Sequence, residues 1–136
     1  MTFEAGVIST RIQYLIQMVQ FHLKLKADWI PDFTEVIDSE TLSATFSLED
    51  GTTLRIHEEY AISSFQLRIR HYAYIWFNTN GEQWLRADNA PHHGGVPTFP
   101  HHLHDFRGKS ARIKPFYGQS TENPDMTQFF VAMREG

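Results

Sequence analysis

The sequence of 136 residues contains no cysteine. This absence excludes disulfide bonds, zinc sites with thiolate ligands and cysteine nucleophiles, and it suits a reducing compartment. The chain also has no apolar run of about 20 residues, the length that a membrane-spanning helix needs. Its N-terminus lacks the basic and then apolar pattern of a signal peptide. We therefore expect a cytoplasmic protein with no membrane contact.

Motifs of two large enzyme classes are missing as well. Gly94-Gly95 is not followed by the Lys-Ser or Lys-Thr pair of a phosphate-binding loop, and no GxSxG sequence marks a serine nucleophile. The formal net charge of −4 argues against a surface that binds nucleic acid everywhere. A local basic region remains open, because the cationic residues between positions 68 and 114 are Arg68, Arg70, Arg86, Arg107, Lys109, Arg112 and Lys114.

The residues that are present indicate an ordinary globular chain. Hydrophobic residues make up 41% of the sequence and aromatic residues 14%, and the length suits one domain over residues 1–136. Apolar residues recur at helical spacing over residues 5–20, whereas residues 21–26 are either a first strand or the end of that helix. Alternating patterns predict strands over residues 41–48, 54–59, 65–78, 82–88 and 111–116, and a helix is expected over residues 123–133.

Asp50-Gly51 and Asn80-Gly81 each provide a tight turn between two of these strands. Two consecutive hairpins predict an antiparallel meander. The expected fold is therefore α+β: one antiparallel sheet of four to six strands, an N-terminal helix and a short C-terminal helix.

Histidine is concentrated in one stretch, residues 88–104. This stretch holds five of the eight histidines and three of the six prolines, so the side chains that titrate near neutral pH lie on a stiffened backbone. Gly94-Gly95 allows the chain to turn back and to bring the two histidine groups together. We expect any chemistry of the protein to start from this loop.

The same stretch resembles the signature of the TumE family of bacterial and archaeal toxin components. The resemblance rests on Asp88-Asn89-Ala90-Pro91-His92-His93 and Pro97-Thr98-Phe99-Pro100-His101-His102-Leu103-His104, and it extends back to Asp50-Gly51. It covers roughly the last two thirds of the chain. The resemblance implies a toxin encoded beside a small antitoxin, often with a helix-turn-helix domain, that neutralises it by direct binding. Toxins of this size commonly act on RNA or on translation.

Two histidines that face a phosphodiester are sufficient to cleave RNA without a metal. A neutral imidazole takes the proton of the 2′-hydroxyl group, and an imidazolium protonates the leaving oxygen. We therefore predict a metal-independent endoribonuclease with no cofactor. Asp88 either orients a histidine or caps the turn that follows it. The candidate catalytic residues are His92, His93, His101, His102, His104 and Asp88.

The predicted long strand, residues 65–78, provides a candidate RNA platform. One of its faces would carry arginines and aromatic rings, which bind phosphates and stack on bases, and Arg86 would join it from the next strand. The same face could instead pack under a helix or against a partner. The candidate substrate-binding residues are Arg68, Arg70, Tyr72, Tyr74, Trp76 and Arg86.

Two alternatives remain open. His101, His102 and His104 with His92 or His93 could bind a divalent metal, but adjacent histidines on an extended chain point apart, so this ranks below acid–base chemistry. The protein could also be a non-catalytic binding domain for RNA or protein, with structural histidines. A homodimer is also compatible with the sequence.

Overall fold

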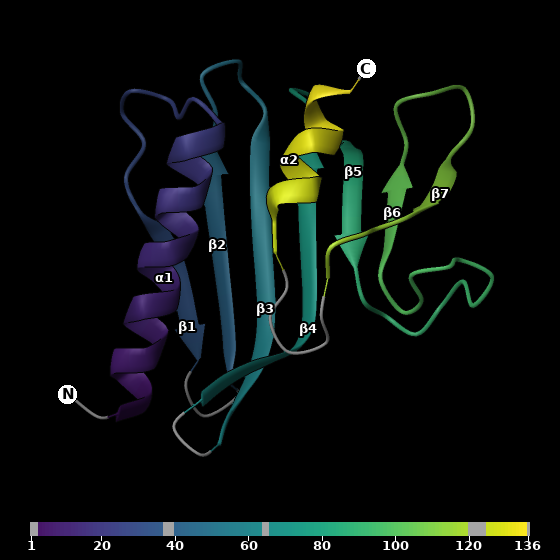
Figure 1. Ribbon diagram of the computed structural model, residues 1–136. Coiled ribbons are helices and arrows are strands. Elements are labelled where there is room, and N and C mark those ends of the chain that lie inside the picture. The colour runs from purple at the N-terminus through teal and green to yellow at the C-terminus, as the bar shows by residue number, and fades with distance from the viewer. Residues whose placement is uncertain (1–2, 37–39, 64–65, 120–124, 136) are drawn as a thin grey trace.

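The computed structural model describes residues 3–36, 40–63, 66–119 and 125–135. Its seven strands form one antiparallel sheet in which every strand pairs with its neighbours along the chain (Figure 1). In chain order the elements are α1 (Phe3–His22), β1 (Asp32–Val36), β2 (Thr41–Ser47), β3 (Thr53–Ser63), β4 (Gln66–Phe77), β5 (Gln83–Asp88), β6 (His102–Asp105), β7 (Arg112–Pro115) and α2 (Thr127–Arg134).

The antiparallel sheet and the two helices confirm the predicted fold class, but four to six strands is wrong. Two of the seven strands were not predicted: β1, and β6 within the histidine stretch. Residues 21 and 22 end α1, and Leu25 then forms an isolated bridge to Leu48. Helix α2 begins at Thr127, later than predicted, and residues 120–124 lie outside the described part of the chain.

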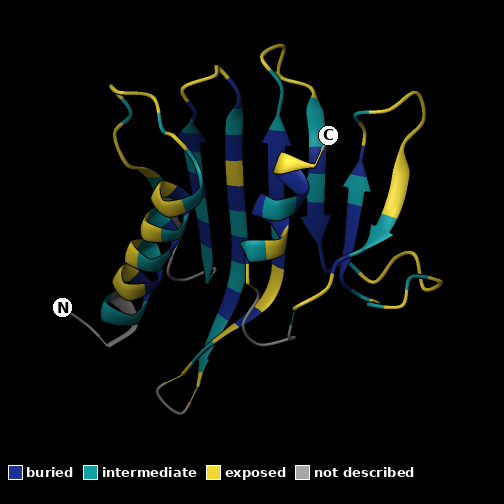
Figure 2. Cartoon of the chain, turned by 45° about the horizontal axis from the view of Figure 1, so that its top comes forward, coloured by how far each residue is buried: buried dark blue, intermediate teal, exposed yellow. Residues whose placement is uncertain are grey.

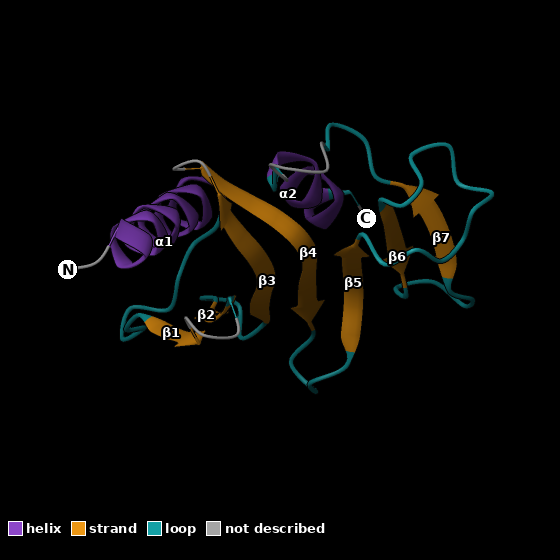
Figure 3. Cartoon of the chain, turned by 90° about the horizontal axis from the view of Figure 1, so that it is seen from below, coloured by secondary structure: helices purple, strands orange, loops and turns teal. Residues whose placement is uncertain are grey.

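Both helices lie on the same side of the sheet (Figure 3). They cover the central strands, and their side chains Leu15, Val19, Phe129 and Phe130 are fully buried against the sheet core. The far end of the sheet, β6 and β7, extends beyond α2. Exposed residues lie on the loops, on β7, along α1 and at the start of β4 (Figure 2). The opposite face of the sheet carries no helix among the described residues.

Both predicted hairpin turns are confirmed. Gly51 and Gly81 have backbone φ angles of 88° and 80°, a region that glycine adopts without the steric cost of a side chain. The Asp50 carboxylate adds to the first turn by accepting hydrogen bonds from the backbone N–H and the hydroxyl of Thr52.

An irregularity in β4 reverses which side chains face the core. Glu59 pairs with His71 and the next residue, Tyr60, pairs with Ile69, so Arg70 has no partner in the β3 register. Such a bulge shifts the alternation of side chains by one residue. As a result Ile69 and Tyr72 are both buried, with 2% and 3% of their surface exposed.

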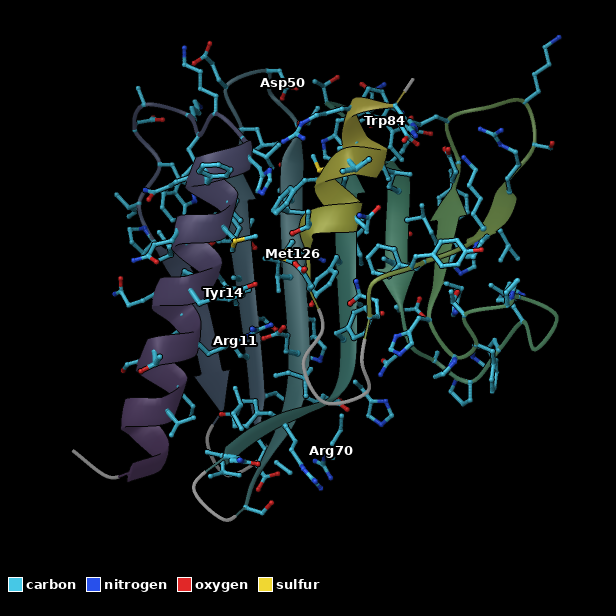
Figure 4. All side chains as sticks on the ribbon, in the orientation of Figure 1. Arg11, Tyr14, Asp50, Arg70, Trp84 and Met126 are labelled. Atoms are coloured by element: carbon cyan, nitrogen blue, oxygen red, sulfur yellow. The ribbon has the colours of Figure 1, made fainter. Side chains whose placement is uncertain are left out.

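Helix α1 is fixed to the sheet by a buried ion pair. Arg11 points from the helix toward the sheet (Figure 4) and donates two hydrogen bonds to the carboxylate of Glu58 on β3. The hydroxyl of Tyr74 donates a third at 3.3 Å. Burial lowers the pKa of Arg11, but contact with Glu58 outweighs it, so the pKa lies above its ordinary value.

A second ion cluster connects β6, β7 and α2. The carboxylate of Asp105 accepts hydrogen bonds from Arg107, Arg112 and Lys114. The bonds from Arg107 contribute most to holding the pKa of Asp105 well below its usual range. Arg107 also donates to the backbone carbonyl of Glu135 just beyond α2. Among the described residues, no helix combines the length and apolar character that crossing a membrane needs.

Candidate active site on the helix-free face of the sheet

Four polar side chains form a block on strands β5 and β6. Leu85 and Ala87 are fully buried in the core, so Arg86 and Asp88, which alternate with them, face the side without helices. In the register of the two strands, Asp88 lies opposite His102 and Arg86 lies opposite His104. Directly opposed residues share a face of the sheet, and the block therefore consists of two cross-strand pairs.

Asp88 is the central acceptor of this block. Its Oδ1 lies 3.0 Å from Nε2 of His102 and also accepts a hydrogen bond from the backbone N–H of Ala90. Its Oδ2 accepts a hydrogen bond from Nε of Arg86 at 2.9 Å. The two roles expected for Asp88 were alternatives, and the structure shows the contacts of both: the carboxylate contacts a histidine and caps the following turn.

His102 is held on both sides. Its Nδ1 lies 3.0 Å from the carbonyl oxygen of Pro100, and its Nε2 faces Asp88. Both partners are hydrogen-bond acceptors, and together they fix the orientation of the ring. Only 1% of the His102 surface is exposed. This residue is therefore placed to orient its neighbours and is not accessible to a substrate.

His93 completes the cluster from the loop between β5 and β6. Its backbone φ of 60° is in the left-handed region, where histidine occurs more often than most residues. Its ring centroid lies 5.1 Å from that of His102 and 5.3 Å from that of His104. We call His93, His102 and His104 the histidine cluster.

His104 is the strand member of the cluster that solvent reaches, because it is half-buried whereas His102 is not exposed. Burial lowers the pKa of His104, and the neighbouring His102 lowers it further, although the charge of Asp88 acts in the opposite direction. The ring stacks on Phe106 with centroids 5.6 Å apart. At neutral pH the lowered pKa favours the neutral imidazole, which is the form that accepts a proton.

His101 points away from the cluster. Its Nδ1 lies 2.8 Å from the hydroxyl oxygen of Tyr72, and burial lowers the pKa of His101 while it raises that of Tyr72. With Phe99 and Tyr117, it lines a pocket of about 300 Å³. His92 is exposed and its ring contacts only the rim of the cluster, 6.3 Å from His93. His101 and His102 thus point apart, as expected, whereas the rings of His92 and His93 remain in contact.

The exposed aromatic face predicted for β4 is wrong. Tyr72, Tyr74 and Trp76 have 3%, 0% and 9% of their surfaces exposed and pack in the core, because the bulge at Arg70 turns them toward the helices. Arg70 is exposed and lies 3.4 Å from Glu40, and Arg68 is also exposed. These residues do not form a continuous platform with the rings, whereas Arg86 belongs to the site.

Two residues that shape the site were not singled out by the sequence. Asn89 accepts the backbone N–H of Tyr72 and donates to the carbonyl of Arg70, so its side chain extends the β4–β5 pairing past the end of β5. Thr98 donates to the carbonyl of His101 and accepts from the N–H of Phe116. Both residues lie within the stretch that resembles the TumE signature, close to predicted site residues, and this position could have identified them.

A sequence model of the family described as Toxin TumE matches residues 23–135. The chain belongs to this family. The match covers most of the chain and begins closer to the N-terminus than the signature alone indicated, and α1 precedes it. Neither the curated proteins nor the solved structures show a significant match to this chain. As a member of a TumE toxin family, the chain has an antitoxin as its general expected partner.

Proposed function

We propose that this TumE-family protein is the toxin of a toxin–antitoxin pair and cleaves RNA as a metal-independent endoribonuclease. The observation that carries the proposal is the block of Arg86, Asp88, His102 and His104 on the helix-free face, with His93 above it. It combines a neutral imidazole, a second accessible imidazole and a guanidinium group in one place.

His104 is the general base in this proposal. Its lowered pKa keeps the ring neutral near pH 7, so it can take the proton of a ribose 2′-hydroxyl group. His93 is exposed, with its ring centroid 5.3 Å from that of His104, and it protonates the leaving 5′-oxygen. The balance is complete: the 2′-oxygen bonds to phosphorus, the bond from phosphorus to the 5′-oxygen breaks, and one proton is taken and one is given.

Arg86 and the buried pair support this reaction. The guanidinium group of Arg86 is held by Asp88 with 38% of its side chain exposed, so it can also bind a phosphoryl oxygen and stabilise the charge that develops there. His102 is a positioning residue, since Asp88 and Pro100 fix its ring and its ring edges contact both His93 and His104.

The finer partner assignments belong to the same proposal. The antitoxin carries a helix-turn-helix domain and neutralises the toxin by direct binding, and RNA is the substrate. The alternative is a non-catalytic binding domain in which Trp76 and Arg70 dominate affinity. The burial of Trp76 reduces the support for that alternative.

The test is incubation of the purified chain with total RNA, with and without a chelator. Wild-type protein is expected to cleave RNA equally in both. Changing His104→Ala removes the base and lowers the rate by about 10²–10⁴-fold. The matched control is His57→Ala, a histidine three strands away on β3 that contacts Ser43, which is expected to keep the wild-type rate.

Circular dichroism of each variant separates loss of chemistry from loss of fold. Cleavage that disappears with the chelator, or that persists undiminished in folded His104→Ala, contradicts the proposed mechanism. Intact RNA in every lane contradicts the proposed ribonuclease activity.

A further inference from the structure

The histidine cluster has a property that acid–base chemistry does not require. His93, His102 and His104 each place one ring nitrogen within 4.8 Å of the other two. Three nitrogens on one tetrahedral zinc ion, at about 2.0–2.1 Å from the metal, lie roughly 3.3 Å apart. Each distance between two of these nitrogens therefore has to shorten by no more than about 1.5 Å for the three to bind one ion.

His102 and His104, the two cluster members on β6, already lie close enough together to bind one ion. His102 and His104 alternate on β6, project from the same face and have ring centroids 4.9 Å apart. His93 is the exposed member and comes from the loop, so its ring can turn toward the other two without disturbing the core. A pair fixed on a strand with a third ligand from a loop makes a three-nitrogen site.

The surroundings of His102 match those of a metal-bound imidazole. Such a ring usually donates its second N–H to a carboxylate or to a backbone carbonyl, which fixes its orientation. His102 has one of each, Asp88 and Pro100, both at 3.0 Å. When one ring nitrogen of His102 binds an ion in place of its oxygen partner, the other nitrogen keeps its hydrogen bond. Asp88 also brings a negative charge to the site, shared with Arg86.

We propose that the histidine cluster binds one divalent transition-metal ion of the Zn²⁺ type and that the bound ion switches off RNA cleavage. Imidazole nitrogens suit zinc, nickel and copper, whereas Mg²⁺ and Ca²⁺ prefer oxygen ligands. The bound ion occupies the lone pairs of His93 and His104, so neither can transfer a proton. The metal site stands by itself, and the inhibition rests on the proposed ribonuclease function.

Calorimetric titration of the full chain with ZnCl₂ and with MgCl₂ tests the site without RNA. Wild-type protein is expected to bind one Zn²⁺ per chain and no Mg²⁺. His93→Ala and His104→Ala are each expected to weaken Zn²⁺ binding by at least about 10-fold, since loss of even an orienting partner costs that much. The matched control is His92→Ala, from the same loop but outside the cluster, which is expected to bind as the wild type does.

Equal Zn²⁺ affinity in all four proteins overturns the metal site. His93 is exposed, so its variant is expected to fold, and its thermal unfolding curve checks this. The inhibition is tested by cleavage of RNA with Zn²⁺ and then with an added chelator. Inhibition that the chelator reverses supports the proposal, and full cleavage by the zinc-bound protein overturns it. If no lane shows cleavage, the proposed ribonuclease activity is contradicted. The titration with ZnCl₂ still tests the metal site independently.

Discussion

At the scale of single residues, Asp88 connects the parts of the site. Its two oxygens contact Arg86, His102 and the backbone of Ala90. The sequence indicated that Asp88 serves either a histidine or a turn, because both roles are typical of an aspartate at the end of a strand. It could not reveal that both contacts occur, since that depends on the pairing of β5 with β6.

The pKa of His104 gives a prediction about the pH dependence of cleavage. Burial disfavours the charged ring, so the folded protein keeps His104 neutral at pH values where an ordinary histidine, with a pKa of 6.5, is already protonated. The acidic limb of kcat/KM against pH is therefore expected below 6.5. An acidic limb at or above this value contradicts the assignment of His104 as the base.

The variant Asp88→Asn provides a second test of the pH dependence of cleavage. The negative charge of Asp88 raises the pKa of His104, so its removal is expected to move the acidic limb to still lower pH. The maximum rate is expected to fall as well, because His102 and Arg86 lose a shared partner. A limb that moves to higher pH shows that Asp88 does not act on the base through its charge.

At the scale of elements, the bulge in β4 explains the main error of sequence-based prediction. An unbroken alternation places Ile69 and Tyr72 on opposite faces, but the unpaired Arg70 places both in the core. No turn residue or glycine marks this bulge in the sequence. Strand β6 was missed for a different reason: its four residues begin two positions after Pro100 and contain two histidines, a pattern typical of a loop.

The register of β3, in contrast, did carry a usable signal. Glu58 falls on the same alternation as Leu54 and Ile56 and is buried with them. A carboxylate at a core position requires a partner, and the amphipathic helix provides it through Arg11. The helix and the strand could be predicted separately, but their contact is a property of the tertiary structure.

This ion pair gives a prediction about stability. Changing Arg11→Met leaves the carboxylate of Glu58 buried without its guanidinium partner, so the free energy of unfolding is expected to fall by about 3–5 kcal/mol. The double variant Arg11→Met, Glu58→Leu removes both charges and is expected to recover most of that loss. Urea unfolding measures both. A loss below about 1 kcal/mol in the single variant, as for an exposed pair, contradicts the account.

At the scale of the whole molecule, the helices and the histidine cluster occupy opposite faces of one sheet. The helices bury the central strands from one side (Figure 3), while β5 and β6 present Arg86, Asp88 and the cluster on the other. Within this site His93, His104 and Arg86 are the side chains that solvent, and therefore RNA, reaches, whereas Asp88 and His102 are buried. The sequence predicted the strands β2 to β5 and β7 and the histidine-rich segment, but not which histidines meet.

The central claim is that the 2′-hydroxyl group of RNA is the attacking group and His104 its base. The most direct measurement uses one RNA oligonucleotide and a version with 2′-deoxyribose at the cleaved position, incubated with the chain and a chelator. The account predicts that only the all-ribose strand is cut, with a 2′,3′-cyclic phosphate and a 5′-hydroxyl as the new ends. Cleavage of both strands, or a 5′-phosphate on the product, would contradict it.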